Sequence, residues 1–235
     1  MTPPLLLLWD IDGTLLQRAS REHADALRAA LVRVHGELSF DGREIEAAGR
    51  TDGAIARDLL VAAGLAPPAI DARADDVIAT CCELYDELCP ADLRPRLAPG
   101  VPDALAALGA RPDAFRFSLV TGNYERVARL KLARAGIGDW FAEGQGGFGS
   151  DAEDREALPP IARARAGDWP RERTVVIGDT PRDIACARAD GLRVVAVATG
   201  PYGVDALADA DAVVDSAAAV VAVLEDWASS RRPPR

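Results

Sequence analysis

The sequence contains almost no lysine and is strongly acidic. Lys131 is the only lysine among 27 basic residues, and the net charge is −10. Nucleic-acid binding depends on clustered lysine and arginine, so this composition argues against a general binder of the phosphate backbone. An acidic surface also repels anionic lipid. Arginine is abundant where lysine is missing, and we attribute the imbalance to genomic compositional bias.

Histidine and cysteine are also scarce, which argues against a zinc site. His23 and His35 are the only histidines, and with the four cysteines they form no recognisable zinc-binding spacing. We expect both histidines on helix surfaces. The cysteines, expected as buried free thiols in a reducing compartment, are Cys81, Cys82, Cys89 and Cys186.

Long hydrophobic runs are missing, although 49% of the 235 residues are hydrophobic. The apolar run near the N-terminus is too short for a membrane span, and no basic segment precedes it as in a secretory signal. We therefore expect a cytoplasmic protein. The length allows one long domain or a core with an inserted subdomain.

Short apolar runs alternate with helix-like segments in much of the chain. A continuous apolar run is typical of a strand covered on both faces, as in a parallel sheet. Helical segments end at Gly136 and Gly191, and another, "SAAAVVAVLEDWA", lies near the C-terminus. The pattern predicts a doubly wound, Rossmann-like α/β core. The expected strands are Leu5–Asp10, Phe115–Val120, Thr174–Gly178, Leu192–Ala198 and Ala212–Asp215.

Residues between the first two expected strands show only helical periodicity. This interruption predicts an all-helical subdomain over residues 20–95, inserted between core segments 1–19 and 96–228, with 229–235 as a flexible tail. "GLAPP" (64–68) is expected as a turn, and the return to the sheet runs through "PRLAPGVP" (95–102). The helices expected in the insertion are Glu22–Val34, Gly53–Ala63 and Ile70–Leu88.

Polar side chains follow three of the expected strands. Ligands of an open parallel sheet bind beyond the carboxyl ends of its strands, so side chains there carry the most information about function. We expect carboxylates and a hydroxyl from three separate strands to converge on one edge. The segments are Asp10-Ile11-Asp12-Gly13-Thr14 after the first strand, Thr121-Gly122-Asn123 after the second, and Asp179 with Asp183 after the third.

Three motifs in these segments resemble the haloacid dehalogenase-like (HAD) superfamily, most closely its phosphoglycolate phosphatase-like branch with a helical C1 cap. They are "DIDGT", "LVTGN" and "GDTPRD", in the family's order and with a helical insertion after the first. The resemblance covers most of the chain. It implies a Mg²⁺-dependent phosphatase that hydrolyses a small organic phosphomonoester through an aspartyl phosphate.

The resemblance also assigns roles that suit phosphoryl transfer. Asp10 would attack phosphorus, and Asp12, two residues later on the same side of an extended chain, would protonate the leaving oxygen and later deprotonate water. Thr121 would bind a phosphoryl oxygen, with the backbone N–H groups of Gly122 and Asn123 as further donors.

The same segments supply oxygen ligands for a hard cation. Asp10, the main-chain carbonyl of Asp12, and Asp179 would hold Mg²⁺, with Asp183 supporting the site from behind. The cation would compensate the negative charge that the apolar first strand delivers into the interior.

The expected third motif departs from the family, because it lacks the usual lysine. The matching stretch "GSDAEDREALPPIARA" offers Arg155, which could clamp phosphate but is bulkier than lysine. Lys131 lies in the middle of a helix, and we expect it on the surface. In the insertion, "GRTDG" (49–53) would bring Arg50 and Thr51 to the substrate or would only cap the following helix.

Other functions remain open at this stage. A sugar phosphomutase shares the nucleophile, and the missing lysine also allows a non-catalytic phosphate-binding pseudoenzyme. Asp12 disfavours a dehalogenase, and an insertion without lysine excludes imine-dependent phosphonate hydrolysis. The expected partner is a small phosphorylated metabolite, with no nucleic acid and no membrane; the substrate and the oligomeric state are not indicated.

Overall fold

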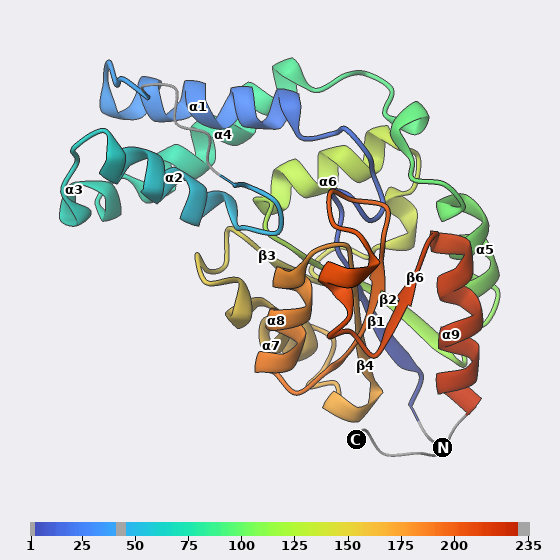
Figure 1. The fold of residues 1–235 in the computed structure, drawn as a ribbon. Helices are drawn as coiled ribbons and strands as arrows, with labels where there is room; N and C mark the ends of the chain where they lie inside the picture. Colours follow the sequence, from blue (N-terminus) through green and yellow to red (C-terminus); the bar gives the residue numbers. More distant parts are fainter. Residues whose placement is uncertain (1–2, 41–45, 230–235) are drawn as a thin grey trace.

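A six-stranded parallel sheet forms the centre of the protein (Figure 1). The computed structural model describes residues 3–40 and 46–229, and within them the strand order is β3-β2-β1-β4-β5-β6. This order confirms the doubly wound α/β fold. The strands are β1 (Leu5–Trp9), β2 (Phe115–Thr121), β3 (Gly147–Phe148), β4 (Thr174–Gly178), β5 (Arg193–Val197) and β6 (Ala212–Val214).

Both faces of β1 are buried, which explains its uniform apolar sequence. Leu5, Leu7 and Trp9 join one hydrophobic cluster, while Leu6 and Leu8 join the other, and all five are fully buried. A strand that lies between two helical layers has no face for polar side chains.

Helices cover the two faces of the sheet (Figure 1). α5 (Val101–Gly109), α6 (Glu125–Arg134) and α9 (Ala217–Ser229) contribute to the cluster of Leu5 and Leu7. α7 (Leu158–Arg165) and α8 (Pro181–Ala189) contribute to the opposite cluster. α5 and α7, as well as the two-residue strand β3, were not among the expected elements; α5 and α7 are short and begin with proline in their first turn.

Of the five α-helices that the structure describes between β1 and β2, the first four lie together above the sheet in Figure 1: α1 (Arg21–His35), α2 (Asp52–Ala62), α3 (Pro67–Asp71) and α4 (Ala74–Leu88). α1 packs along α4. The single helix expected over Ile70–Leu88 is wrong, because Arg73 leaves the helical conformation and separates α3 from α4. The subdomain boundaries at residues 20 and 95 stay a prediction.

All four cysteines are buried and free. No helix within the described ranges is both long and apolar enough to cross a membrane. Of the tail expected at 229–235, Ser229 ends α9, and the remainder lies outside the described residues.

Candidate active site

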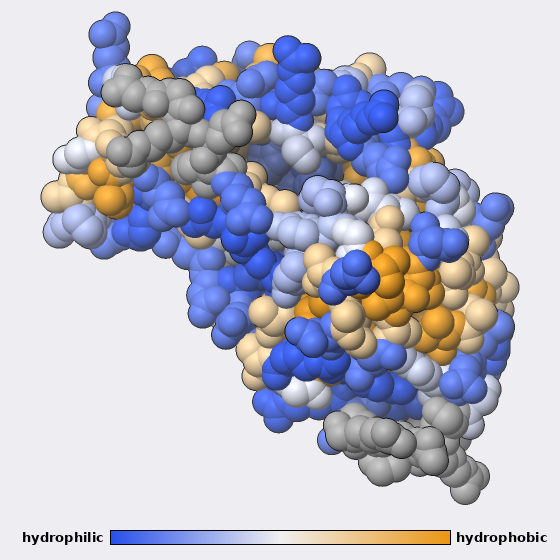
Figure 2. Space-filling model, in the orientation of Figure 1, coloured by the Kyte–Doolittle hydropathy of each residue, from blue (hydrophilic) through white to orange (hydrophobic). Residues whose placement is uncertain are grey.

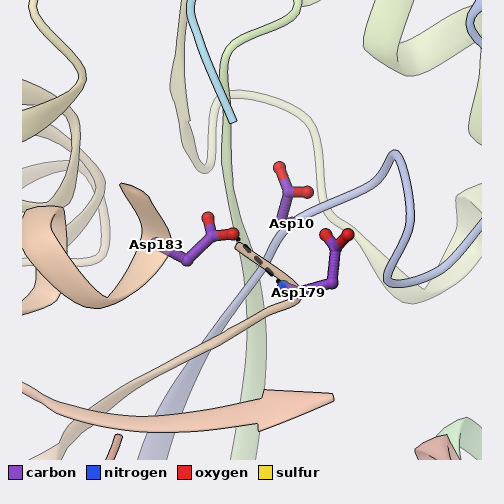
Figure 3. Close-up of side chains that lie close together, drawn as sticks. All are labelled: Asp10, Asp179 and Asp183. Carbon is purple, nitrogen blue, oxygen red and sulfur yellow. Dashed lines mark hydrogen bonds between the residues drawn. The ribbon is translucent and has the colours of Figure 1, made fainter. Parts of the chain in front are cut away.

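The carboxyl ends of β1 and β4 bring two aspartates to one edge of the sheet. Trp9 is in register with Ile177 of β4, so Asp10 and Asp179 emerge near each other. With Asp183 of α8 they form a cluster in which one oxygen from each carboxylate lies within 4.8 Å of the others. Figure 3 shows the three carboxylates around a common space. All three residues are buried.

Burial and neighbouring charges raise the pKa values of Asp10 and Asp179. Burial, together with the charges of Asp183 and Asp12, raises the pKa of Asp10 to about 7 against the attraction of Arg155. Burial and the charges of Asp10 and Asp183 raise the pKa of Asp179 to about 8. A cation between Asp10 and Asp179 would stabilise their charged forms, because it offsets both the lost hydration and the mutual repulsion.

One oxygen of Asp179 has the surroundings expected of a metal ligand. Thr14 Oγ1 donates to Asp179 Oδ1 at 3.1 Å, whereas the buried Oδ2 has no hydrogen-bond partner. A Cβ at Gly13 or Gly200 would lie 2.1 or 1.6 Å from that oxygen, so both positions must lack a side chain. Gly13 also has a φ of +95°, which favours glycine. This oxygen-rich environment fits Mg²⁺.

Asp183 holds the segment that carries Asp179. Its Oδ2 accepts from the backbone N–H groups of Asp179 and Thr180, at 3.2 and 3.0 Å, and from Thr180 Oγ1 at 2.7 Å. Thr180 and Asp183 form a capping box at the start of α8. Since Arg155 occupies the other oxygen, these contacts favour a supporting role for Asp183 over direct metal ligation, which stays a prediction.

Arg155 is the buried cation beside the expected nucleophile. Its Nη2 lies 3.0 Å from Asp10 Oδ1 and also contacts Asp183 Oδ1. The residue is 7% exposed and lines the cavity described below. The structure therefore places Arg155 where it contacts Asp10 directly, and its role toward phosphate stays a prediction.

The expectation that Lys131 lies on the surface is wrong. Its side chain is fully buried, and Nζ contacts Asp12 Oδ1 and Oδ2 at 2.8 and 2.6 Å. A signal was present in the sequence: Lys131 follows Val127 by four residues and Ala128 by three, so it shares their buried face of α6. A carboxylate partner makes burial of the ammonium possible.

His23 is likewise not a surface residue. It is 7% exposed, its Nδ1 lies 3.3 Å from Lys131 Nζ, and its Nε2 lies 3.0 Å from Asp52 Oδ2. The sequence signal is again helical spacing, because His23 precedes the buried Ala26 and Leu27 by three and four residues. His35 is half-buried at the end of α1.

The loop after β2 contributes Thr121, Gly122 and Asn123. Thr121 is fully buried, and its Oγ1 accepts from Asn123 Nδ2 at 2.7 Å, which leaves the hydroxyl hydrogen for another acceptor. Gly122 and Asn123 line the cavity, and Asn123 Nδ2 also donates to Asp12 Oδ2 at 2.9 Å. Phosphate binding by this loop stays a prediction.

The "GRTDG" loop contacts the core through both its backbone and its side chains. Thr51 is the N-cap of α2, accepting from Ala54 N at 3.2 Å, and it donates to the Glu153 carbonyl at 2.5 Å. Thr51 is 1% exposed and is not among the residues that line the cavity, whereas Arg50 lines it with a guanidinium bound to Asp58 at 2.6 Å. This geometry favours the capping interpretation of Thr51 over substrate contact.

Gly122→Ala should weaken the packing of the "GRTDG" loop against the loop after β2. An added Cβ would lie 2.0 Å from the Arg50 carbonyl oxygen, which is backbone and cannot turn aside. We expect a loss of about 1–3 kcal/mol in the free energy of unfolding, measured by chemical denaturation, together with lower activity. Gly203→Ala is the control, because nothing lies within 4 Å of its added Cβ. Equal stability of the two variants would contradict the close approach at Gly122.

A cavity of about 610 Å³ lies between the inserted helices and the sheet edge. In Figure 2 the surface is indented between the upper body, which carries α1 to α4, and the lower body. Asp10, Asp12, Asn123, Arg155 and Asp179 line the cavity from the core. The inserted helices and their loops contribute residues that include Leu27, Arg28, Arg50 and Ile55. A small substrate therefore fits between the two parts.

Comparison with known proteins identifies the family. The haloacid dehalogenase-like hydrolase model matches residues 7–188, and a HAD-hydrolase-like model matches residues 156–226. The plasmid phosphoglycolate phosphatase of Cupriavidus necator is 32% identical over 229 residues, covering 94% of each chain.

Solved structures with the same fold include a haloacid dehalogenase-like family hydrolase from Streptococcus pneumoniae, with a TM-score of 0.62, 19% identity and coverage of 95% of this chain and 99% of that one. A β-phosphoglucomutase from Clostridium difficile has a TM-score of 0.64, 16% identity and coverage of 97% of each chain. The model match, the relative and the arrangement of acids at the sheet edge agree: the chain belongs to the haloacid dehalogenase-like hydrolase family.

Proposed function

We propose that this protein is a Mg²⁺-dependent phosphatase that hydrolyses a small organic phosphomonoester through an aspartyl phosphate on Asp10. The observation that carries the proposal is the setting of Asp10: it is buried beside Arg155, shares a cluster with Asp179, and lines a cavity of about 610 Å³. Asp12 lines the same cavity. These groups match the needs of phosphoryl transfer, which are a nucleophile, positive charge and a proton donor.

In the first step, Asp10 attacks phosphorus opposite the leaving oxygen. Arg155 would lie beside the phosphoryl group, and its contact with Asp10 Oδ1 supports this role. The Thr121 hydroxyl and the N–H groups of Gly122 and Asn123 would hydrogen-bond the phosphoryl oxygens. Asp12 protonates the leaving oxygen, and in the second step it takes a proton from the water that hydrolyses the acyl phosphate.

The proposed metal would be held by Asp10, the main-chain carbonyl of Asp12, and Asp179. The unpartnered Oδ2 of Asp179 and the two side-chain-free glycines around it support this assignment. When bound, Mg²⁺ supplies positive charge that lowers repulsion between the phosphate and the acids. Asp183 keeps the backbone at Asp179 in place.

The relative from Cupriavidus necator suggests phosphoglycolate as the first substrate to test. A panel of phosphorylated metabolites with Mg²⁺, assayed for released phosphate, tests the function directly. A sugar phosphomutase, the second candidate because of the structural similarity to β-phosphoglucomutase, would instead convert a sugar phosphate to its isomer. Binding of phosphate without turnover of any substrate would contradict both enzymatic functions.

The cytoplasmic location stays a proposal that the buried free cysteines support.

Arg155→Lys should retain activity and Arg155→Ala should lose it. Either cation can reach Asp10 and phosphate from this position, but alanine removes a donor from the transition state, which typically reduces kcat about 10²-fold to 10³-fold. Steady-state kinetics of both variants, with thermal unfolding to verify the fold, checks the expectation. Wild-type kinetics for Arg155→Ala would reject a role in phosphate binding.

A further inference from the structure

Lys131 is buried in a position that uses all its hydrogen-bond donors. An ammonium has three N–H groups. The Nζ atom lies 2.6 Å from Asp12 Oδ2, 2.7 Å from Asn123 Oδ1 and 3.3 Å from His23 Nδ1. Lys131 is fully buried and does not line the cavity. The ammonium is therefore held by protein side chains and does not itself line the cavity.

The carboxylate of Asp12 lies between this cation and the cavity. Lys131 contacts both of its oxygens, Asn123 Nδ2 donates to Oδ2 at 2.9 Å, and Ser20 Oγ donates to Oδ1 at 3.3 Å. The side chain of Asp12 is nevertheless 24% exposed and lines the cavity. These contacts restrict its rotation while leaving it accessible to a substrate or to water.

The inserted helices complete the surroundings of Lys131. His23 comes from α1, and Asp52, which lies 3.0 Å from His23, begins α2. Asp52 Oδ2 also accepts from the Tyr124 backbone N–H at 2.7 Å, at the start of α6. Contacts from both the core and the insertion thus fix the position of Lys131. Arg155 cannot take its place, because it contacts Asp10 and Asp183 instead.

We propose that Lys131 is a positioning residue that holds Asp12 for proton transfer during hydrolysis of the aspartyl phosphate. The inference rests on the proposed phosphatase function and adds a second cation with a separate task. Arg155 contacts the nucleophile Asp10, whereas Lys131 contacts the acid-base residue Asp12. Small displacements of a reacting group are costly, since a misplacement of about 1 Å reduces a rate by roughly 10²-fold.

Lys131→Met tests this role with p-nitrophenyl phosphate. The p-nitrophenolate group leaves without a proton, so formation of the aspartyl phosphate does not require Asp12, whereas attack by water does. We expect kcat to fall about 100-fold and KM to fall in parallel, so that kcat/KM changes by less than about threefold. Rapid-mixing experiments should show a burst of about one p-nitrophenolate per active site. A parallel loss of kcat and kcat/KM, or an unchanged kcat, would overturn the proposal.

A double variant separates positioning from damage to the fold. If Lys131 acts through Asp12, then Asp12→Asn with Lys131→Met should have the same kcat as Asp12→Asn alone, because there is no carboxylate left to position. This comparison also decides the matter if Lys131→Met does not fold, since the double variant removes both charges together. A further loss of more than about tenfold in the double variant would refute the role.

Arg163→Met is the matched control. Arg163 is a largely buried cation paired with Asp190 at 2.7 Å, and it does not line the cavity. We expect it to lower stability without a burst or a change in kcat. A burst in this control would show that the signature comes from general destabilisation and would overturn the proposal. An inactive wild type would refute the phosphatase function itself, whereas an active wild type with no selective effect of Lys131→Met refutes only the positioning role.

Discussion

Asp10→Asn should reduce kcat by at least about 10⁴-fold without unfolding the protein. The amide has nearly the shape of the carboxylate but is not a nucleophile, so the aspartyl phosphate cannot form. The position is buried and in contact with Arg155, and an amide oxygen can still accept that hydrogen bond. Phosphate release and single-turnover trapping of the phosphoenzyme measure the loss.

The control for this variant is Asp190→Asn. Asp190 is another buried aspartate, which Arg163 and Arg171 contact at 2.7 and 2.9 Å, away from the cavity. It should lose stability while each folded molecule keeps its activity. Turnover by Asp10→Asn at more than about a tenth of the wild-type rate, far above what loss of a nucleophile permits, would refute covalent catalysis by Asp10.

Removal of Mg²⁺ should abolish activity, and Asp179→Asn should raise the Mg²⁺ concentration needed for half-maximal activity by at least about tenfold. The reason is the buried, unpartnered Oδ2 of Asp179, which loses its charge in the variant. Titration of the chelated enzyme with Mg²⁺ measures the change in apparent affinity. Equal Mg²⁺ dependence of the wild type and Asp179→Asn would place the metal elsewhere.

The stability of the metal-free protein should depend on pH. Asp10 and Asp179 have pKa values of about 7 and about 8 instead of 3.8, so the folded, metal-free protein holds protons that the unfolded chain has released. Its stability should therefore fall as the pH rises from about 4 to about 8. Bound Mg²⁺ requires the ionised forms, so its stabilising effect should grow over the upper part of that range. Thermal unfolding with and without Mg²⁺ checks this, and Asp179→Asn should reduce both trends.

The positions of the acids follow from the sequence because a simple geometric rule applies to them. Apolar runs mark the parallel strands, and the carboxyl ends of parallel strands share an edge. Asp10 and Asp179 could therefore be assigned to the same site from the ends of "LLLLW" and "TVVIG" alone. The helices around the sheet follow from periodicity, although the short α5 and α7 and the strand β3 carry too few residues to be recognised in this way.

Lys131 and His23 show where such reasoning fails. Charge alone suggests a solvated surface, but helical spacing places both residues on apolar faces. The carboxylate that makes burial of Lys131 possible is distant in sequence, because Asp12 is 119 residues from Lys131. His23 of α1 and Lys131 of α6 meet only when the inserted helices fold over the core, and no local sequence pattern predicts that contact.

The burial of Lys131 also determines which reactive groups the folded surface offers to other molecules. It is the only lysine in the sequence and it is fully buried. The folded surface therefore displays its positive charge as guanidinium and offers no side-chain amine to acetylating enzymes, ubiquitin ligases or acylating reagents. Any modification of Lys131 would report that α1 and α2 had moved away from the core or that the chain had unfolded.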